Sequence, residues 1–432
     1  MSLFKPIYIK GNSFQIGLYA AITVFLTYTM VFGFRKSFTI ATFDGMTIAG
    51  YSYKTILVIS QMLGYMLAKF YGIKYISELK RHGRGKIILF LTSISWLSWL
   101  FFALIPAPFN ILFLLINGFP LGMLWGVVFS YVEGRRSTDF IGATLAVSFI
   151  FASGFVKTVG AWLMLNFNIS EFWVPFFTGL VFAGPLLLFV YLIEKIPAPD
   201  DEDVAYRMNR IPMLAADRKK FIRMFLPGLS ACILIYTFAT IFRDMRDNFG
   251  AEMWKEMGFF DKPELFAKTE TPISIIILIL IGSMVLIKDS FRAFLLSHVL
   301  IGMGFVLAGI CSFLFINGAM TPVWWMTLVG LGLYMVYIPF NSVFFERMIA
   351  SFKHTGNVGF LIYLADSFGY VGSLGVMFSK EIFKIQLNWV NFFSNSVILL
   401  SLAGLALTIF SFIYFYTKQK ALILERISSG IK

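Results

Sequence analysis

The sequence predicts an all-α membrane protein with twelve transmembrane helices, and three observations support this fold class. Apolar residues make up 58% of the 432-residue chain and charged residues only 14%, whereas a soluble chain has about 45–50% apolar and about 25% charged residues. The apolar residues gather in segments of about 20 residues, the length that a helix needs to cross a hydrocarbon core. The charged residues stand in short loops between these segments. Twelve such segments fill the chain and leave no room for a sizeable soluble domain.

The predicted helices follow one another along the whole chain. The first follows Lys5 and Lys10 but has no small-residue cleavage site and runs into Arg35 and Lys36, so we expect a retained span and not a signal peptide. The twelve apolar segments are residues 16–34, 53–73, 87–105, 109–132, 140–165, 174–194, 225–243, 273–287, 293–315, 322–345, 357–379 and 392–416.

The positive charges predict the orientation of the chain. If the N-terminus is cytoplasmic, the loops on that side carry most of the 36 Lys and Arg residues, and cytoplasmic loops of membrane proteins show this excess. We therefore expect both termini to be cytoplasmic in a multi-pass protein of the cell membrane. In a Gram-negative bacterium this would be the inner membrane.

The longest polar stretch divides the predicted spans six and six. It begins with Pro and acidic residues, becomes basic, and reads as a cytoplasmic linker. The predicted organisation is an N-terminal six-helix half at 1–194, a linker at 195–223 and a C-terminal six-helix half at 224–432.

An internal repeat supports this division. Arg35 and Arg243 end the first helix of each half, and Glu133 and Glu346 close the fourth. The halves therefore look like parallel duplicates related by a pseudo-twofold axis along the membrane normal, which is the arrangement of major facilitator transporters.

Several classes of function are excluded by the pattern of the chain. The net charge of +13 does not predict a nucleic-acid site, because the basic residues lie in short loops and not on one folded face. Cys232 and Cys311 lie in apolar segments, and His82, His298 and His354 are scattered without metal-ligand spacing. We therefore expect no metal, no cofactor and no enzyme activity.

Ionisable residues at membrane depth are costly and are therefore candidates for function. Arg35 and Arg243 occupy equivalent repeat positions, so the pseudo-twofold axis would place both arginines in one layer of a cavity between the halves. Two guanidinium forks there suit a doubly charged oxyanion such as a phosphate. Lys36, next to Arg35, is a further candidate for binding the substrate. The structural alternative for each arginine is a snorkelling residue at the interface.

Three further charges lie inside predicted spans. Lys157 in the fifth and Asp366 in the eleventh are repeat equivalents to within about a turn, so a buried ion pair between them is one reading. A charge lock that substrate or a proton opens is the functional reading, and direct substrate contact is a third. Lys69, near the end of the second span, either snorkels or faces the substrate.

The chain resembles the organophosphate:phosphate antiporters, which include the glycerol-3-phosphate and hexose-phosphate transporters. The resemblance rests on segments spread along nearly the whole chain, which are Phe34-Arg35-Lys36-Ser37-Phe38, Gly50-Tyr51-Ser52, Gly64-Tyr65 through Lys69-Phe70, Asn117-Gly118-Phe119 through Trp125, Arg243 with Trp254-Lys255-Glu256, and Phe368-Gly369-Tyr370-Val371-Gly372.

This resemblance implies the roles of the candidate site residues. It implies that Arg35 and Arg243 bind the phosphoryl group, and that four further side chains line the same cavity, namely Tyr28, Tyr65, Lys69 and Trp125.

The chain also departs from the pattern of that family. Phe151-Ala-Ser153-Gly154 replaces a histidine of the glycerol-phosphate branch, Asn248-Phe249 replaces an acidic-aromatic pair, and Asp366 falls where the family has no acid.

The predicted function is a secondary active transporter that moves a small organic phosphate or related anion by alternating access, with inorganic phosphate as a candidate for the exchanged partner. One alternative is a proton-coupled carboxylate transporter that uses Asp366 and Lys157. Another is a transporter-like membrane sensor of a phosphorylated ligand. The expected partners are a small anionic solute and the lipid bilayer, and no obligate protein partner is readable from the sequence.

Overall fold

The computed structural model describes residues 11–77, 83–132, 135, 138–199, 215–352, 358–383 and 388–428. Within these ranges the chain is almost entirely helical, and its one small sheet pairs β1 with β2 in antiparallel register. The elements are α1 (Ser13–Phe32), η1 (Ser37–Ile40), β1 (Thr47–Ile48), β2 (Tyr51–Ser52), α2 (Tyr53–Ser77), α3 (Arg84–Leu104), α4 (Ile111–Phe129), α5 (Thr138–Asn166), α6 (Val174–Ile193), α8 (Ala215–Asn248), α9 (Gly250–Glu256), α10 (Glu264–Val285), α11 (Ser290–Ile316), α12 (Pro322–Ser342), α13 (Phe344–Ser351), α14 (Val358–Ile382) and α15 (Trp389–Ser428).

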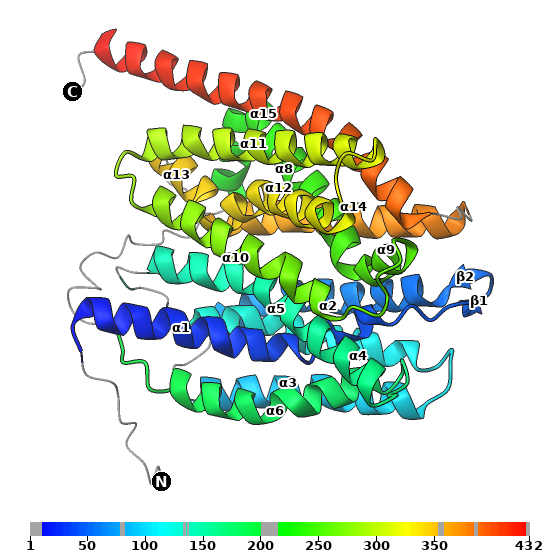
Figure 1. Ribbon diagram of the computed structural model, residues 1–432. Helices are drawn as coiled ribbons and strands as arrows, with labels where there is room; N and C mark the ends of the chain where they lie inside the picture. The colour runs from blue at the N-terminus through cyan, green and yellow to red at the C-terminus, as the bar shows by residue number, and fades with distance from the viewer. Residues whose placement is uncertain are drawn as a thin grey trace. The chain divides into compact units, whose positions relative to one another are not determined.

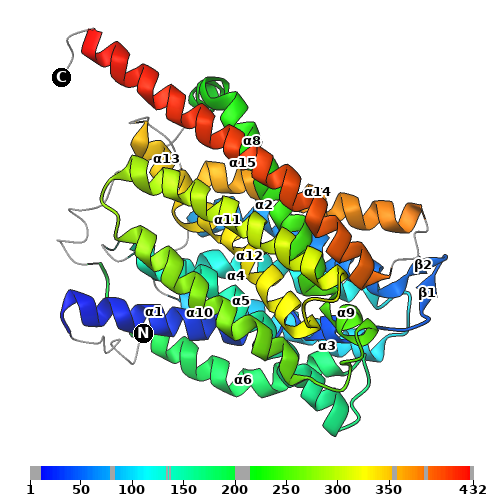
Figure 2. The same ribbon diagram turned by 45° about the horizontal axis from the view of Figure 1, so that its top comes forward.

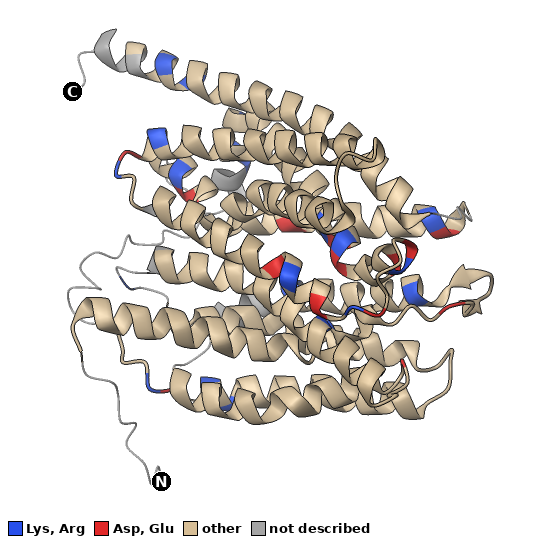
Figure 3. Cartoon of the chain, viewed as in Figure 1, with Lys and Arg blue, Asp and Glu red and all other residues tan. Residues whose placement is uncertain are grey.

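The long helices confirm the all-α membrane fold class. In the described part of the chain, 11 helices are long and apolar enough to cross a membrane, and the remaining predicted span coincides with α2, which is 25 residues long. The long helices carry few charged side chains over most of their length (Figure 3). A closed pattern of backbone hydrogen bonds is what an apolar bilayer core demands, and helices provide it.

The faces of α1 show how these helices distribute their side chains. Phe14, Leu18 and Ile22 recur every four residues and are exposed, whereas Ala20 and Val24 are fully buried. A stripe of exposed Phe, Leu and Ile would be costly in water but is not in hydrocarbon. The helix therefore presents one apolar stripe to lipid and packs the other against the protein.

The described chain forms two compact units. Unit 1 comprises Met1–Arg207, Arg246–Ile275 and Leu374–Trp389, and unit 2 comprises Met208–Met245, Ile276–Ser373 and Val390–Lys432. Four helices have residues in both units, which are α8, α10, α14 and, by its first residue alone, α15. The division into compact units does not test the predicted internal repeat. The six-and-six division of the helices and the cytoplasmic position of the termini therefore stay predictions. Of the predicted linker, residues 200–214 lie outside the described residues and residues 215–223 begin α8.

Within unit 1, α1 packs on α5 and α6, α2 packs on α4, and α3 packs on α4 and α6 (Figures 1 and 2). Within unit 2, α11 packs on α12 and α13. Glycines allow the closest of these contacts. A Cβ on Gly64 of α2 would stand 2.1 Å from the Leu115 carbonyl oxygen, and one on Gly118 of α4 would stand 2.2 Å from the Gln61 carbonyl oxygen. The backbones of α2 and α4 therefore approach each other closely, as helices in membranes do where small residues line their interface.

Candidate functional site

The backbone just after α1 is held by side-chain donors. Helix ends leave carbonyl groups without helical partners, and here the carbonyl oxygen of Phe34 accepts hydrogen bonds from Trp99 Nε1 at 2.7 Å and Asn117 Nδ2 at 3.1 Å. The carbonyl oxygen of Arg35 accepts one from Gln61 Nε2 at 3.0 Å. These bonds place Arg35 beside α2 and α4.

Four of the predicted site residues meet in unit 1. The guanidinium carbon of Arg35 lies 4.4 Å from the ring centre of Tyr65. Lys69, one turn further along α2, places its Nζ 5.2 Å from the same ring and 5.9 Å from the ring of Trp125. The indole N–H of Trp125 is buried and has no hydrogen-bond partner among the described residues. We call Arg35, Tyr65, Lys69 and Trp125 the aromatic-cation cluster.

Tyr28 reaches this cluster through an aromatic neighbour. Its ring packs on Phe32 at 5.4 Å and on Phe149 at 5.3 Å, and Phe32 lies 5.4 Å from the guanidinium carbon of Arg35. The side chain is almost fully buried. The structure therefore connects Tyr28 to the cluster through the ring of Phe32, which lies against both Tyr28 and Arg35.

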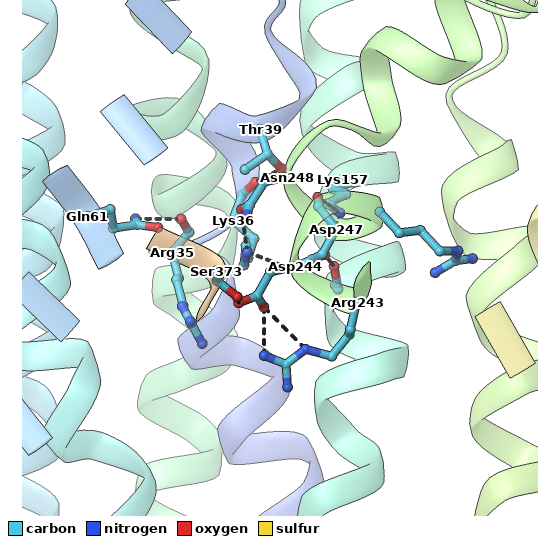
Figure 4. A network of polar contacts seen from close by, with 12 residues as sticks. Arg35, Lys36, Thr39, Gln61, Lys157, Arg243, Asp244, Asp247, Asn248 and Ser373 are labelled. Atoms are coloured by element: carbon cyan, nitrogen blue, oxygen red, sulfur yellow. Dashed lines mark hydrogen bonds and ion pairs between the residues drawn. The ribbon is translucent and has the colours of Figure 1, made fainter. Parts of the chain in front are cut away.

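Lys36 and Lys157 converge on one carboxylate that the sequence reasoning had not selected as their partner. Lys36 Nζ lies 2.5 Å from Asp247 Oδ2, and Lys157 Nζ lies 2.6 Å from Asp247 Oδ1. Ser153 Oγ also donates to Asp247 Oδ1, and Lys36 Nζ donates to Asn248 Oδ1 at 2.8 Å (Figure 4). We call Lys36, Ser153, Lys157 and Asp247 the lysine clamp.

Two further buried ion pairs in unit 1 were also missed. Arg246 Nη1 lies 2.5 Å from Glu270 Oε1, and Lys54 Nζ lies 2.5 Å from Glu252 Oε1. The sequence could not predict either pair, because no spacing rule names a partner on another helix. Their burial follows the rule that charges away from water are paired.

The predicted residues of unit 2 form a second polar group. Arg243 lies with its guanidinium carbon 3.9 Å from the ring centre of Tyr337, and its Nη2 donates to the adjacent Asp244 Oδ1 at 2.6 Å. The other oxygen of Asp244 accepts a hydrogen bond from Ser373 Oγ at 2.9 Å (Figure 4). Asp366 accepts a short hydrogen bond from the phenol of Tyr236.

The two members of the predicted charge lock therefore have different described partners, Asp247 for Lys157 and Tyr236 for Asp366. A direct Lys157–Asp366 pair stays a prediction. In the part of the chain that the structure describes, no group of three or more His, Cys, Asp or Glu side chains could hold a metal ion.

The geometry thus gives each unit an arginine on a tyrosine face inside a bundle of membrane helices. A comparison with protein-family models matches residues 37–418 to the family of unknown function DUF5690. The chain belongs to this family. Comparison with curated proteins finds no significant sequence match.

Solved structures show the fold class of this DUF5690 member. A proton-dependent oligopeptide transporter matches with a TM-score of 0.61 at 14% identity, covering 94% of this chain and 100% of that chain. A D-xylose–proton symporter matches with a TM-score of 0.57 at 14% identity, covering 92% and 97%. A bacterial homologue of the human lysosomal transporter Spinster matches with a TM-score of 0.55 at 13% identity, covering 95% and 98%. The chain therefore has the major facilitator fold, and the structures that share it are transporters and not enzymes.

Proposed function

We propose that the protein is a secondary transporter that moves a small organic phosphate or a related anion across the membrane by alternating access, in exchange for inorganic phosphate. The observation that carries the proposal is that each of the two candidate arginines lies on the face of a tyrosine ring. Arg35 lies on Tyr65 and Arg243 lies on Tyr337, each within 4.4 Å of the ring centre. Neither guanidinium can lose its charge at any accessible pH.

The ring faces orient the two forks without neutralising them. A tyrosine face attracts a cation through its quadrupole but leaves the N–H groups at the edge of the guanidinium plane. Asp244 engages Nε and Nη2 of Arg243, and a guanidinium has five N–H donors. Planar forks of this kind match the oxygens of a phosphate bidentately.

The surroundings of Arg35 supply further donors for the same anion. Lys69 brings a second positive charge to the ring of Tyr65, and Trp125 brings a buried indole N–H that lacks a hydrogen-bond partner among the described residues. A buried donor without a partner is uncommon, and an anionic ligand would satisfy it. We propose that both arginines bind the phosphoryl group, with Lys69 and Trp125 beside Arg35.

Counterflow in proteoliposomes tests the proposal. Vesicles loaded with unlabelled inorganic phosphate should take up labelled phosphate or a phosphate ester faster than vesicles without protein. A membrane sensor would bind the ligand without accelerating flux, which separates that alternative.

Proton-coupled carboxylate uptake is the other alternative. Its signature is uptake driven by an inward proton gradient and lost in an Asp366→Asn variant. A rate of phosphate exchange that is the same with and without a proton gradient would favour the proposal.

A first measurement identifies the ligand before any flux assay. The thermal unfolding of the purified protein is followed in the presence of phosphates, phosphate esters and carboxylates. A ligand at about 100 times its dissociation constant adds about 2.7 kcal/mol to the free energy of unfolding. Protection by phosphates and esters but not by carboxylates is the expected result.

A further inference from the structure

The lysine clamp has the form of an occupied anion site. Three donors, Lys36 Nζ, Lys157 Nζ and Ser153 Oγ, converge on the two oxygens of one carboxylate. Lys157 and Ser153 lie one turn apart on α5 and so share a face, while Lys36 follows the end of α1. All three donors belong to unit 1, where the segments on both sides of Lys36, α1 and η1, pack on α5.

The charges of the clamp do not balance. Two ammonium groups face one carboxylate, and about 6% of either lysine side chain is exposed. The neighbouring buried pairs differ, because Lys54 and Glu252 match one cation with one carboxylate, as do Arg246 and Glu270. One oxygen of each glutamate lacks a hydrogen-bond partner among the described residues, Oε2 in both cases. Both oxygens of Asp247, in contrast, are engaged.

Asp247 is more exposed than either lysine of the clamp and lies near the end of its helix. Its side chain is 16% exposed, whereas each lysine side chain is 6% exposed. It stands one residue before the end of α8, and α9 follows at Gly250. The boundary between the two units falls in α8 just before it, between Met245 and Arg246. Hinge positions are commonly such element-terminal residues.

We propose that Lys36, Ser153 and Lys157 form an anion site for the oxygens of the transported solute, and that the Asp247 carboxylate occupies this site as an internal competitor when the solute does not. A carboxylate or phosphoryl group presents oxygens like those of Asp247, and each ammonium has three donors to offer. Exchange of one anion for another keeps both buried lysines paired, whereas an empty site would leave them uncompensated. The inference rests on the proposed function for the identity of the solute, but the site itself can be tested alone.

The test uses the purified full-length protein in detergent and formate as the probe. In an Asp247→Ala variant the thermal midpoint should fall, and formate should restore most of the loss with a saturable dependence on its concentration. Sodium chloride at equal ionic strength should restore much less. Adding Lys157→Met to the variant should abolish the rescue by formate.

A matched control removes Glu252, a buried carboxylate that forms an ion pair with one lysine, Lys54, and not with two. Glu252→Ala should also lower the thermal midpoint, but formate should act on it no more than chloride does. Equal effects of formate on the two variants, or no effect of formate beyond chloride on Asp247→Ala, would overturn the proposal.

A second variant keeps the test decisive if Asp247→Ala does not fold. Asp247→Asn keeps the shape of the side chain and removes the competing charge, so formate should protect it at lower concentrations than it protects the wild-type protein. Protection at equal or higher concentrations would overturn the proposal. If formate acts as expected but no phosphate or phosphate ester binds the wild-type protein, the proposed function fails and the anion site stands. If phosphate binding depends on Arg35 and Arg243 but formate has no specific effect, only the anion site fails.

Discussion

The ring of Tyr65 lies under the guanidinium of Arg35, with 4.4 Å between the ring centre and the guanidinium carbon. The same ring lies 5.2 Å from Nζ of Lys69. Two cations that share one aromatic neighbour repel each other, and an anion bound near both would weaken that repulsion. This relationship is why we propose that the cluster contacts the substrate.

We expect Arg35→Lys and Arg243→Lys each to weaken the binding of the transported anion by about tenfold or more. Lysine keeps the charge but loses the planar fork, and hydrogen bonds to charged groups contribute about 1.5–3 kcal/mol each. Isothermal titration calorimetry with the ligand from the thermal screen measures the change. Snorkelling arginines would make the opposite prediction, so wild-type affinity in both variants would discard the proposed site.

Tyr65 should act through its ring and not through its hydroxyl group. Tyr65→Phe keeps the aromatic face under Arg35, so anion affinity should change little. Tyr65→Leu removes the face, and we expect a loss of roughly 0.5–2 kcal/mol in anion binding. The same calorimetric titration compares the two variants. Equal losses in Phe and Leu would show that the hydroxyl group matters and the cation–π contact does not.

The close approach of α2 and α4 should be intolerant of a single methyl group. In Gly118→Ala the new Cβ would stand 2.2 Å from the Gln61 carbonyl oxygen, so backbone must move, and we expect a destabilisation of about 1–3 kcal/mol. Gly184→Ala on α6 is the matched control, because nothing lies within 4 Å of a Cβ there. Thermal unfolding in detergent measures both variants. A Gly118→Ala protein as stable as the control would contradict the packing.

The Lys157–Asp247 contact should be strongly non-additive in a double-mutant cycle on stability. Asp247→Leu leaves both buried lysines without their shared carboxylate and should cost about 3–5 kcal/mol, whereas adding Lys157→Met removes one of these two unpaired charges and should recover part of that loss. Lys157→Met, Asp247→Leu and the double variant form the cycle.

A parallel cycle with Lys157→Met and Asp366→Leu tests the pair that the repeat predicts. Coupling in the second cycle is the expected result if these two residues meet during transport, and additivity there would remove Asp366 from the charge lock. Additivity in the first cycle would contradict the clamp.

The exposed ion pair between Asp44 and Lys255 should contribute little to the free energy of unfolding, and that contribution should disappear at acidic pH. A hydrogen bond from Lys255 lowers the pKa of Asp44 below its ordinary value, so the pair stabilises the folded state above the unfolded pKa of the carboxyl group, and the contribution is lost as the pH falls through the folded pKa. Asp44→Asn should therefore cost within about 1 kcal/mol at neutral pH. Thermal unfolding at neutral pH and at about pH 3 measures this, and an effect that is larger at the lower pH would contradict the assignment.

The sequence by itself determined the fold class and most of the candidate residues. Hydrophobic segments of the length of a bilayer core can only be spanning helices, because no other open structure satisfies its backbone in lipid. Charges in those segments are rare and stand out, which is why Arg35, Lys69 and Lys157 were readable without a structure. The resemblance to organophosphate antiporters added Tyr65 and Trp125, and the structure does place these beside Arg35 and Lys69.

Only the tertiary structure decided which charges meet. Repeat symmetry pointed from Lys157 to Asp366, but the described carboxylate partner of Lys157 is Asp247. A contact between residues far apart in sequence depends on how helices rotate and approach, and here glycines such as Gly118 set that approach for α2 and α4. The physical reason is burial. A cation that is removed from water needs a carboxylate within about 4 Å, and the packing of the helices decides which carboxylate lies there.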